Sequence, residues 1–255
     1  MNTGGAAILA NLQAVARERA ARAADPVLAS KVIHLKEYQQ RRFLHTYADF
    51  IASARYGGAA RFFLNELYGP ADFTDRDTQF ERVVPSLALL FPHEIVETAT
   101  ALSALHALTE SLDTVMASNA CATEWTPAAY LRTWQATGRP ADRDTQISLT
   151  VSLARRLDRM TRSVLLRTGL RLMRAPARAS GLEQLQRFLE AGFDTFGALG
   201  GAEDFIREIE QRERAFVSRM FGADLRGAES DAGECAVLAG LPKARRASES
   251  PAGVR

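Results

Sequence analysis

The sequence predicts an all-α fold, in which one helical-bundle-like domain of about eight helices is followed by a disordered C-terminal tail. Apolar residues recur every three or four positions in most segments as far as Phe221, which is the period of an amphipathic helix. No segment shows the strict alternation of apolar and polar residues that predicts a β-strand. From Gly222 onwards the chain is rich in Gly, Ser, Ala and charged residues and has no period, so we expect its deletion to leave the folding transition almost unchanged. The predicted units are an N-terminal amphipathic helix, a helical domain and a disordered tail, at residues 1–24, 25–221 and 222–255.

Two helices are expected at the start of the chain. Residues 6–24 carry an apolar stripe with arginines beside it, which is typical of a short amphipathic helix. An organellar transit peptide would show the same pattern, although a plain N-terminal helix is its more common cause. Asp25 followed by Pro26 supplies a helix cap and a first-turn proline, and a long helix is expected from there to about Ala54.

A tight turn between two helices comes next. Gly69 can take the left-handed conformation that ends a helix, and Pro70 cannot continue the helix. Thr74, followed three residues later by Asp77, resembles a capping box at the start of the next helix. We interpret the polar and turn-forming residues of this stretch as architectural: Tyr68, Gly69, Pro70, Asp72, Arg76 and Asp77.

The rest of the domain is expected to contain six helices, and they span residues 75–90, 92–120, 126–138, 141–174, 182–199 and 203–221. Pro85 is expected to kink the first of them. Thr126 is an expected N-cap, and Ser180 with Glu183 forms a second expected capping box. The helix over 141–174 has an excess of Arg, for which contact with phosphates or anionic lipid is an alternative to a solvated face.

Some of these residues also form distinctive strings. The first, around the turn, consists of Phe62-Phe63-Leu64, Leu67-Tyr68-Gly69-Pro70, Asp72-Phe73 and Arg76-Asp77. Two further stretches add to it: Leu105-His106-Ala107-Leu108 with Glu110 and Leu112-Asp113, and Leu185 to Phe196 followed by Arg212-Glu213. With these strings the chain resembles a bacterial protein family, a domain of unknown function with the signature FFLxxLYGPxDFxxRD. The resemblance covers most of residues 30 to 221 and implies a family, but no activity, ligand or catalytic residue.

The composition excludes several classes of protein. Hydrophobic residues make up 47% and charged residues 24% of the 255 positions, as in ordinary globular proteins. The formal charge of +2 is too small to indicate a nucleic-acid partner. No apolar run is long enough to span a membrane, and the N-terminus lacks the apolar core of a secretion signal. Cys121 and Cys235 suggest neither a disulfide framework nor a thiolate metal site, so we expect a cytoplasmic protein.

One group of polar residues has the composition of a chemical site. Ser103, His106, Glu110 and Asp113 are separated by three or four positions, so they lie along one face of the helix expected over 92–120. Imidazole and carboxylates within reach of one another can bind a metal or transfer protons. The alternative is a polar flank that bonds to neighbouring helices, and the Glu-x-x-His pattern of di-iron bundles is absent from this helix.

Glu213 is the second candidate. In the register of Ile206, Ile209 and Phe216 it takes a position where an apolar residue is expected. A carboxylate that faces a core must be paired, hydrogen-bonded or protonated. We expect a structural salt bridge with Arg76, with His106 or with another Arg, and a catalytic or ligand-binding acid is the alternative.

Two functional hypotheses follow. The first is a non-enzymatic protein that binds another protein, a second copy of itself or a small ligand within the bundle, because no catalytic motif is recognised. The second is a helical-bundle metalloprotein or oxidoreductase that uses His106, Glu110 and Asp113, with Glu213 or His93. The sequence assigns neither a cofactor nor a definite metal ligand.

Overall fold

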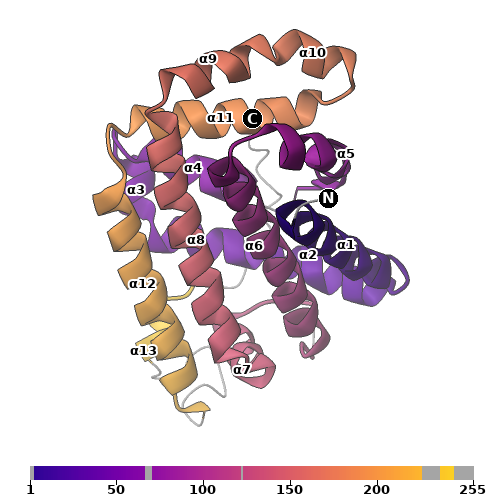
Figure 1. The fold of residues 1–255 in the computed structure, drawn as a ribbon. Helices are drawn as coiled ribbons and strands as arrows, with labels where there is room; N and C mark the ends of the chain where they lie inside the picture. The colour runs from indigo at the N-terminus through magenta and orange to yellow at the C-terminus, as the bar shows by residue number, and fades with distance from the viewer. Residues whose placement is uncertain (1–2, 67–70, 122, 226–235, 244–255) are drawn as a thin grey trace.

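The computed structural model describes residues 3–66, 71–121, 123–225 and 236–243, and every regular element within these ranges is a helix (Figure 1). The predicted all-α class is therefore confirmed. The helices in chain order are α1 (Thr3–Ala23), α2 (Pro26–Thr46), α3 (Ala48–Ala52), α4 (Gly57–Glu66), α5 (Thr74–Leu90), α6 (His93–Ser118), α7 (Pro127–Thr137), α8 (Pro140–Thr161), α9 (Val164–Leu172), α10 (Arg174–Ala179), α11 (Glu183–Ala198), α12 (Glu203–Gly222) and α13 (Ala236–Ala239).

There are more helices than the sequence predicts because two expected long helices are interrupted and because α13 lies within the predicted tail. The helix expected to reach Ala54 ends at Thr46, and the short helix α3 follows it. The helix expected over 141–174 ends at Thr161. Ser163 then takes an extended conformation, and its Oγ accepts a hydrogen bond from the backbone N–H of Leu166 at 3.3 Å as the N-cap of α9. The prediction of continuous helices was wrong at both places.

Two of the four predicted N-terminal helix caps are confirmed. Asp25 and Thr126 cap α2 and α7, and each accepts hydrogen bonds from first-turn N–H groups at 3.0–3.2 Å. The two predicted capping boxes were wrong, because Phe73 and Leu182 hold the N-cap positions of α5 and α11 and make no side-chain cap bond. A Ser or Thr followed by an acid three residues later is thus not sufficient to locate a capping box here.

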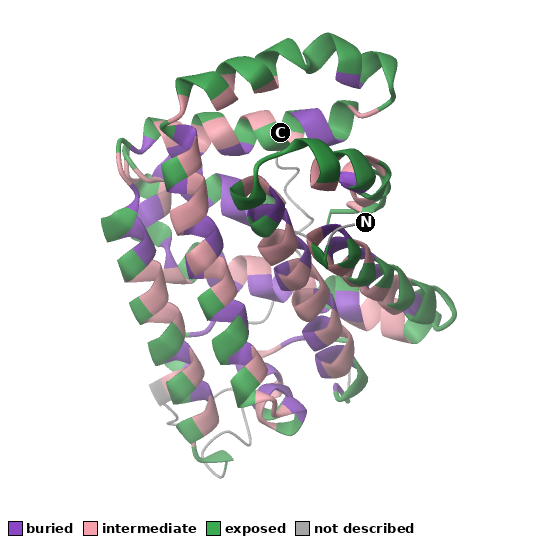
Figure 2. Cartoon of the chain, viewed as in Figure 1, coloured by how far each residue is buried: buried purple, intermediate pink, exposed green. Residues whose placement is uncertain are grey.

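The long helices form a bundle that is closed at both ends. Helices α12, α8 and α6 lie side by side, and α2 crosses behind them (Figure 1). Helix α1 packs along α6 and α5, α11 covers one end of the bundle together with α9 and α10, and α7 lies at the other end. The inner faces of α6 and α8 are thereby covered by other helices, whereas α8 also has an exposed outer face (Figure 2).

The interior contains three hydrophobic clusters, and the buried residues face inward from the long helices (Figure 2). The first cluster, near α7 and α13, includes Tyr38, Met116, Leu131, Trp134 and Met220. The second cluster, near α3, α4 and α11, includes Phe43, Phe63, Val151, Phe196 and Phe205. The third cluster joins α1 to α5 and α6 and includes Ile8, Leu12, Val84 and Val96.

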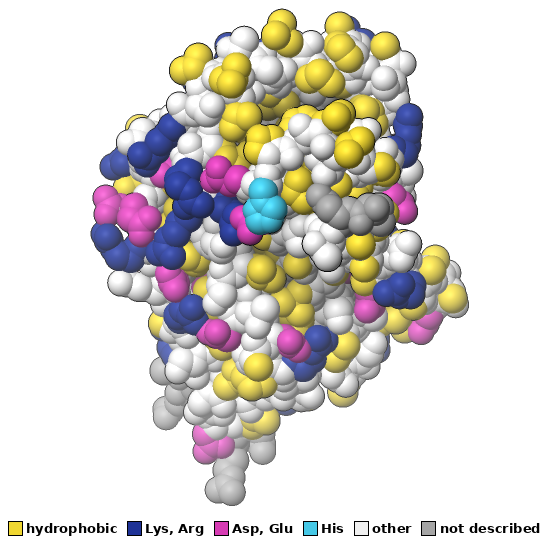
Figure 3. Space-filling view, viewed as in Figure 1, with side chains coloured by type: hydrophobic (Ala, Val, Ile, Leu, Met, Phe, Trp, Pro, Cys, Tyr) yellow, Lys and Arg dark blue, Asp and Glu magenta, His cyan; other side chains and the backbone are white. Residues whose placement is uncertain are grey.

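The arginines of α8 are paired with carboxylates across the surface. Arg155 lies 3.3 Å from Glu203, and Arg156 lies 2.9 Å from Glu97. Basic and acidic side chains accordingly lie next to one another on the face drawn in Figure 3. This pairing weakens the interpretation of the arginine excess as a phosphate-binding or lipid-binding face. None of the described helices is both long and apolar enough to cross a membrane.

Residues 236–243, the described part of the chain beyond Leu225, differ from the disordered tail predicted by its composition. Residues 236–243 include α13, and Leu238 and Leu241 are buried in the first cluster. The hydroxyl of Tyr38 donates a hydrogen bond to the backbone carbonyl of Pro242 at 3.1 Å. Leu238 and Leu241 alone are too few apolar residues to predict from the sequence that this segment packs on the domain. In the structure they pack on the first cluster.

We therefore expect Leu241→Ala to destabilise the protein, contrary to the behaviour expected of a disordered tail. Removal of a buried leucine side chain lowers the free energy of unfolding by about 2–4 kcal/mol. Urea denaturation measures this loss. Leu225→Ala is the control, because Leu225 is exposed and its substitution should change the free energy by less than about 0.5 kcal/mol. Equal effects in the two variants would contradict the packing of this segment.

Candidate functional site

The predicted polar residues of α6 face three other helices. Ser103 accepts a hydrogen bond from the side-chain amide of Asn11 in α1 at 3.1 Å. The Nε2 atom of His106 lies 2.8 Å from Oδ2 of Asp77 in α5. Burial alone would raise the pKa of Asp77, but the hydrogen bond and charge of His106, together with nearby arginines, lower it.

Glu110 lies at the centre of this face and is almost completely buried. Its carboxylate accepts hydrogen bonds from Arg22 of α1 and from Lys36 of α2, the latter at 2.6 Å. Burial alone would raise the pKa of Glu110, but the charges and hydrogen bonds of Lys36 and Arg22 outweigh it and lower the pKa to about 2. Glu110 is therefore a carboxylate held by two cations, which leaves it poorly suited to proton transfer near neutral pH.

Asp113, one turn further along α6, has a different environment. Its Oδ1 accepts a hydrogen bond from the amide of Gln39 at 3.0 Å, and Nζ of Lys36 is 4.0 Å from Oδ2. Burial raises the pKa of Asp113, and neither the charge of Lys36 nor the Gln39 hydrogen bond fully offsets this effect. Two carboxyl groups on one helix face therefore have pKa values shifted in opposite directions.

Glu213 of α12 is paired with an arginine, which is one of the expected kinds of partner. Both carboxylate oxygens accept hydrogen bonds from the guanidinium of Arg42 in α2, at 2.8 and 3.2 Å. The hydroxyl of Tyr47 donates to the same carboxylate at 2.7 Å. Burial alone would lower the pKa of Arg42, but the charge of Glu213 raises it above its usual value, so the guanidinium keeps its positive charge.

Four helices contribute polar side chains to one layer between the first and second hydrophobic clusters. In addition to the residues above, Arg143 of α8 donates to the side chain of Gln146 at 3.1 Å and lies over the ring of Trp134, 4.1 Å from its centroid. The amide of Gln146 donates in turn to Thr109 of α6 at 2.8 Å. We call this set the polar layer, and it consists of Gln39, Arg42, Thr109, Asp113, Arg143, Gln146 and Glu213.

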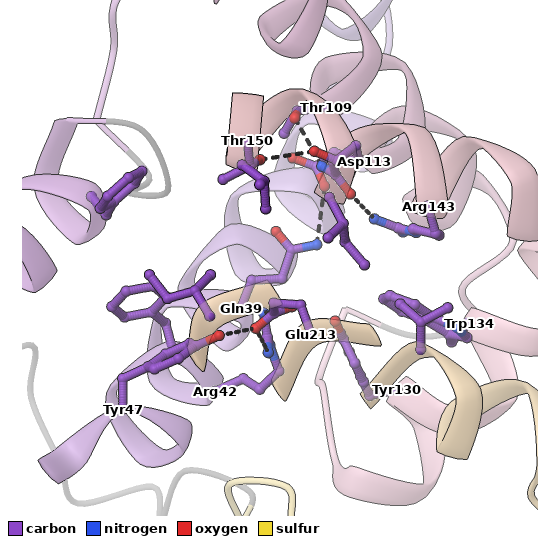
Figure 4. Close-up of a pocket in the computed structure, with 17 residues that line it drawn as sticks. Gln39, Arg42, Tyr47, Thr109, Asp113, Tyr130, Trp134, Arg143, Thr150 and Glu213 are labelled. Carbon is purple, nitrogen blue, oxygen red and sulfur yellow. Dashed lines mark hydrogen bonds and ion pairs between the residues drawn. The ribbon is translucent and has the colours of Figure 1, made fainter. Parts of the chain in front are cut away.

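The polar layer surrounds a cavity of about 60 Å³. Thr109, Thr150 and Asp113 lie on one side of the space, Arg42, Tyr47 and Glu213 lie opposite, and Tyr130 and Trp134 lie at one end (Figure 4). The remaining lining residues are Gln39, Phe43, Phe63, Arg143, Gln146, Ile147, Val151, Ile209 and Val217. The cavity therefore has both a charged and an apolar part.

Six buried side-chain nitrogens of the described residues have no acceptor. They are Nε1 of Trp125 and Trp134 and Nε of Arg22, Arg41, Arg42 and Arg167, and of these residues Trp134 and Arg42 line the cavity. A buried donor without a partner costs about 1–3 kcal/mol, and buried polar groups in native proteins almost always have a partner of some kind. Each of these atoms has less than 1 Å² of accessible surface, so none of them faces the cavity.

The turn that follows α4 is held by arginine and carboxylate contacts. Tyr68, Gly69 and Pro70 lie outside the described residues. Asp72 accepts a hydrogen bond from the backbone N–H of Thr74 at 2.9 Å. Arg76 donates to the backbone carbonyl of Glu66 at 2.9 Å and lies over the rings of Phe73 and Phe188.

The predicted polar stripe does not form a metal-binding set in this arrangement. In the part of the chain that the structure describes, no three His, Cys, Asp or Glu side chains come together as possible ligands. His106 and Asp77 lie on the α1 and α5 side of α6, whereas Glu213 lies across the cavity from Asp113. The structure thus separates His106 from Glu213, which the metalloprotein hypothesis combined.

Sequence reasoning missed part of the site. Arg143 and Gln146 share a helix face with Ile147 and Val151, so a polar start to an apolar stripe was visible in the sequence. Arg143 and Gln146 lie in the string Asp-Arg-Asp-Thr-Gln, which also occurs at residues 75–79 and whose residue types are typical of helix starts. Trp134 had no such signal, because a tryptophan in a helical stripe is ordinarily a core residue.

The fold and the polar layer define an all-α bundle protein with a charged interior cavity. Residues 18–226 match the model of the family described as Domain of unknown function (DUF8198), and the chain belongs to this family. The match includes the range covered by the sequence resemblance, and the family description names no activity. No curated protein and no solved structure matches the chain.

The opposite pKa shifts on α6 lead to a test of the electrostatics. We expect Glu110→Gln to lower the free energy of unfolding at pH 7, because Arg22 and Lys36 lose their shared carboxylate. The shift of the pKa from 4.5 to about 2 corresponds to about 3 kcal/mol. A carboxyl group whose pKa is lower in the folded than in the unfolded protein stabilises the fold at pH values above the unfolded pKa. The difference in the free energy of unfolding between Glu110→Gln and the wild type should therefore shrink as the pH falls from 4.5 towards 2. Denaturant titrations at several pH values measure it.

Asp113→Asn is the matched variant. The pKa of Asp113 is raised above its usual 3.8, so the folded state favours the protonated form and the carboxylate costs stability as the pH rises. The amide retains an oxygen for the Gln39 hydrogen bond and removes the charge. We therefore expect unchanged or higher stability at pH 7. Similar losses in both variants would show that the two carboxyl groups are not distinguished as described.

Proposed function

We propose that this protein is a non-enzymatic binding protein that takes a small ligand into the cavity of the polar layer. The observation that carries the proposal is the cavity of about 60 Å³, whose lining combines charged, polar and apolar side chains. A ligand in this space would contact apolar side chains and a few polar groups, as in most small-molecule sites.

The chemistry of the lining supports binding more than catalysis. Among the described residues that line the cavity there is no His, Cys, Ser or Lys, so the lining contains neither a histidine base nor a thiol, serine or amine nucleophile. The two carboxyl groups of the lining are engaged by Gln39 and by Arg42 with Tyr47. The groups that remain available are hydrogen-bond donors and apolar side chains, which hold and orient a ligand.

A thermal-shift screen of small polar metabolites tests this function. A ligand present at about one hundred times its Kd stabilises the folded protein by about 2.7 kcal/mol. For a chain of this size such a gain raises the Tm by roughly 5–10 °C. We expect at least one compound that fits the cavity to produce a saturable increase of this kind.

Thr150→Leu should abolish the ligand-dependent increase in Tm, because the larger apolar side chain fills part of the cavity. Thr145→Leu is the matched control on the same helix. Both threonines donate to the backbone carbonyl four residues earlier, at 2.8 and 2.9 Å, but Thr145 is exposed and lies outside the cavity. A screen in which no compound stabilises the wild type more than Thr150→Leu would disprove the proposed function.

A further inference from the structure

A second hollow of the molecule lies at one corner of the bundle, away from the polar layer. It is an open cleft of about 400 Å³ between the connection from α8 to α9 and the connection from α11 to α12, which lie side by side (Figure 1). Small-molecule sites commonly have volumes of about 300–1,000 Å³, so the cleft has room for a ligand.

The lining of this cleft has more positive than negative side chains. Its ionisable residues are Asp158, Arg162 and Arg167. Both oxygens of Asp158 are engaged, because Oδ2 accepts a hydrogen bond from Arg162 at 2.6 Å and Oδ1 accepts one from the backbone N–H of Ala202 at 3.0 Å. Arg167 has no carboxylate partner among the described residues. The lining therefore carries one unbalanced positive charge, on Arg167.

The guanidinium of Arg167 lies in the wall of the cleft. Its Nη2 donates a hydrogen bond to the backbone carbonyl of Thr161 at 3.2 Å and lies against Gly197, where a Cβ atom would overlap it. Thr161 and Gly197 both line the cleft. Nη1 of Arg167 makes no hydrogen bond to a described residue and is not one of the buried nitrogens without an acceptor, so solvent reaches it. Nη1 is thus an available donor on an unpaired cation, and the buried Nε plays no part.

The loop between α11 and α12 adds backbone donors to the same cleft. Leu199 is right-handed, whereas Gly200 and Gly201 have φ values of 63° and 119°, which favour glycine. Neither glycine N–H donates a hydrogen bond to a described residue. The carbonyl oxygens of Leu199 and Gly201 accept hydrogen bonds from Arg55 at 3.2 and 3.0 Å, so these two acceptors are engaged. A right-handed residue followed by a left-handed one is a backbone conformation that turns successive N–H groups towards an anion.

These donors fit a phosphate group. The side-chain donors come from one connection and the backbone donors from the other, so a bound group needs accepting oxygens that point in several directions. A phosphate ester has three accepting oxygens, whereas a carboxylate has two. The guanidinium is always charged and matches phosphate geometry. Val164, the first residue of α9, also lines the cleft, so the positive end of the α9 dipole adds to the attraction.

We propose that this cleft binds a phosphate group, held by the guanidinium of Arg167 and by the backbone N–H groups of Gly200 and Gly201. Arg162 contributes a second positive charge to the lining. The cleft is separate from the interior cavity, so the inference does not depend on the proposed function. Inorganic phosphate, a soluble phosphate ester and a lipid head group share this chemistry.

Three probes distinguish these sources on the full chain. Inorganic phosphate and glycerol 3-phosphate are titrated by calorimetry in sodium chloride at constant ionic strength, and phosphatidylcholine vesicles with or without phosphatidic acid are tested by co-sedimentation. Saturable binding of the soluble probes assigns a soluble phosphate. Binding only of vesicles that contain phosphatidic acid assigns a lipid head group, next to which the exposed Val164 and Leu165 would lie. We expect one of these two results, and no saturable binding of any probe would overturn the inference.

Arg167→Gln removes the unpaired charge. We expect the bound probe to lose affinity by at least about tenfold, because a charged donor is lost. Arg171→Gln is the matched control on α9, since Arg171 lies 3.7 Å from Asp194 and is outside the lining. Its affinity should equal that of the wild type. Equal affinities of the wild type and Arg167→Gln would overturn the inference.

Gly197→Ala displaces the guanidinium without removing it. The new methyl group takes the position of Nη2 of Arg167, so this flexible side chain must move, whereas Ala favours the helix more than Gly does. We expect at least about tenfold weaker phosphate binding in a variant that urea denaturation shows to be folded. Gly169→Ala in α9 is the matched control, because a Cβ there has no neighbouring atom within 4 Å. Unchanged binding in Gly197→Ala would contradict the placement of phosphate at Arg167.

Thr150→Leu separates this cleft from the interior cavity. Thr150 lines the interior cavity and not the cleft, so the variant should bind the phosphate probe with unchanged affinity. A loss of affinity would place the phosphate in the interior cavity and overturn the inference.

Discussion

The structure depends on the polar layer that crosses the interior of the bundle between two hydrophobic clusters. Apolar helix faces can slide past one another at small cost, since hydrophobic contact is not directional. A guanidinium that donates two hydrogen bonds to one carboxylate has a fixed geometry. Arg42 and Glu213 therefore set the position of α2 against α12. Glu110 sets α1 and α2 against α6 through Arg22 and Lys36. A shift of any of these helices would leave a buried charge unpaired.

The sequence predicted the helices better than it predicted their interruptions and partners. Apolar periodicity located α6, α7 and α12 to within a few residues, because it reports the buried face of one helix. It could not show the break at Ser163, since a single N-cap residue is a weak signal inside a periodic segment. The polar stripe of α6, Ser103, His106, Glu110 and Asp113, was predictable for a similar reason, because its residues are three or four positions apart in the sequence. Its partners Arg22 and Lys36 are more than 70 residues away in the chain, and local spacing holds no information on such contacts.

Glu110 and Asp113 show how much the surroundings of a carboxyl group matter. They lie one turn apart on the same helix, and both are buried. Two cations offset the desolvation of Glu110, whereas a neutral amide is the hydrogen-bond partner of Asp113. The ion pairs thus offset the cost of burial of Glu110 on the α1 side of α6, whereas the burial of Asp113 beside the cavity is not fully offset. Buried donors without acceptors occur on both sides, on Arg22 as well as on Arg42 and Trp134.

This asymmetry bears on why the layer is polar at all. Replacing a buried ion pair by well-packed apolar residues is often neutral or stabilising, so stability alone does not require charges between two hydrophobic clusters. The pairs that fix helix register have a structural role, because each joins two helices with a geometry that apolar contact does not supply. Asp113, which lines the cavity, has a neutral amide as its hydrogen-bond partner, and burial raises its pKa. The carboxyl group beside the cavity is therefore the member of the layer that stability explains least.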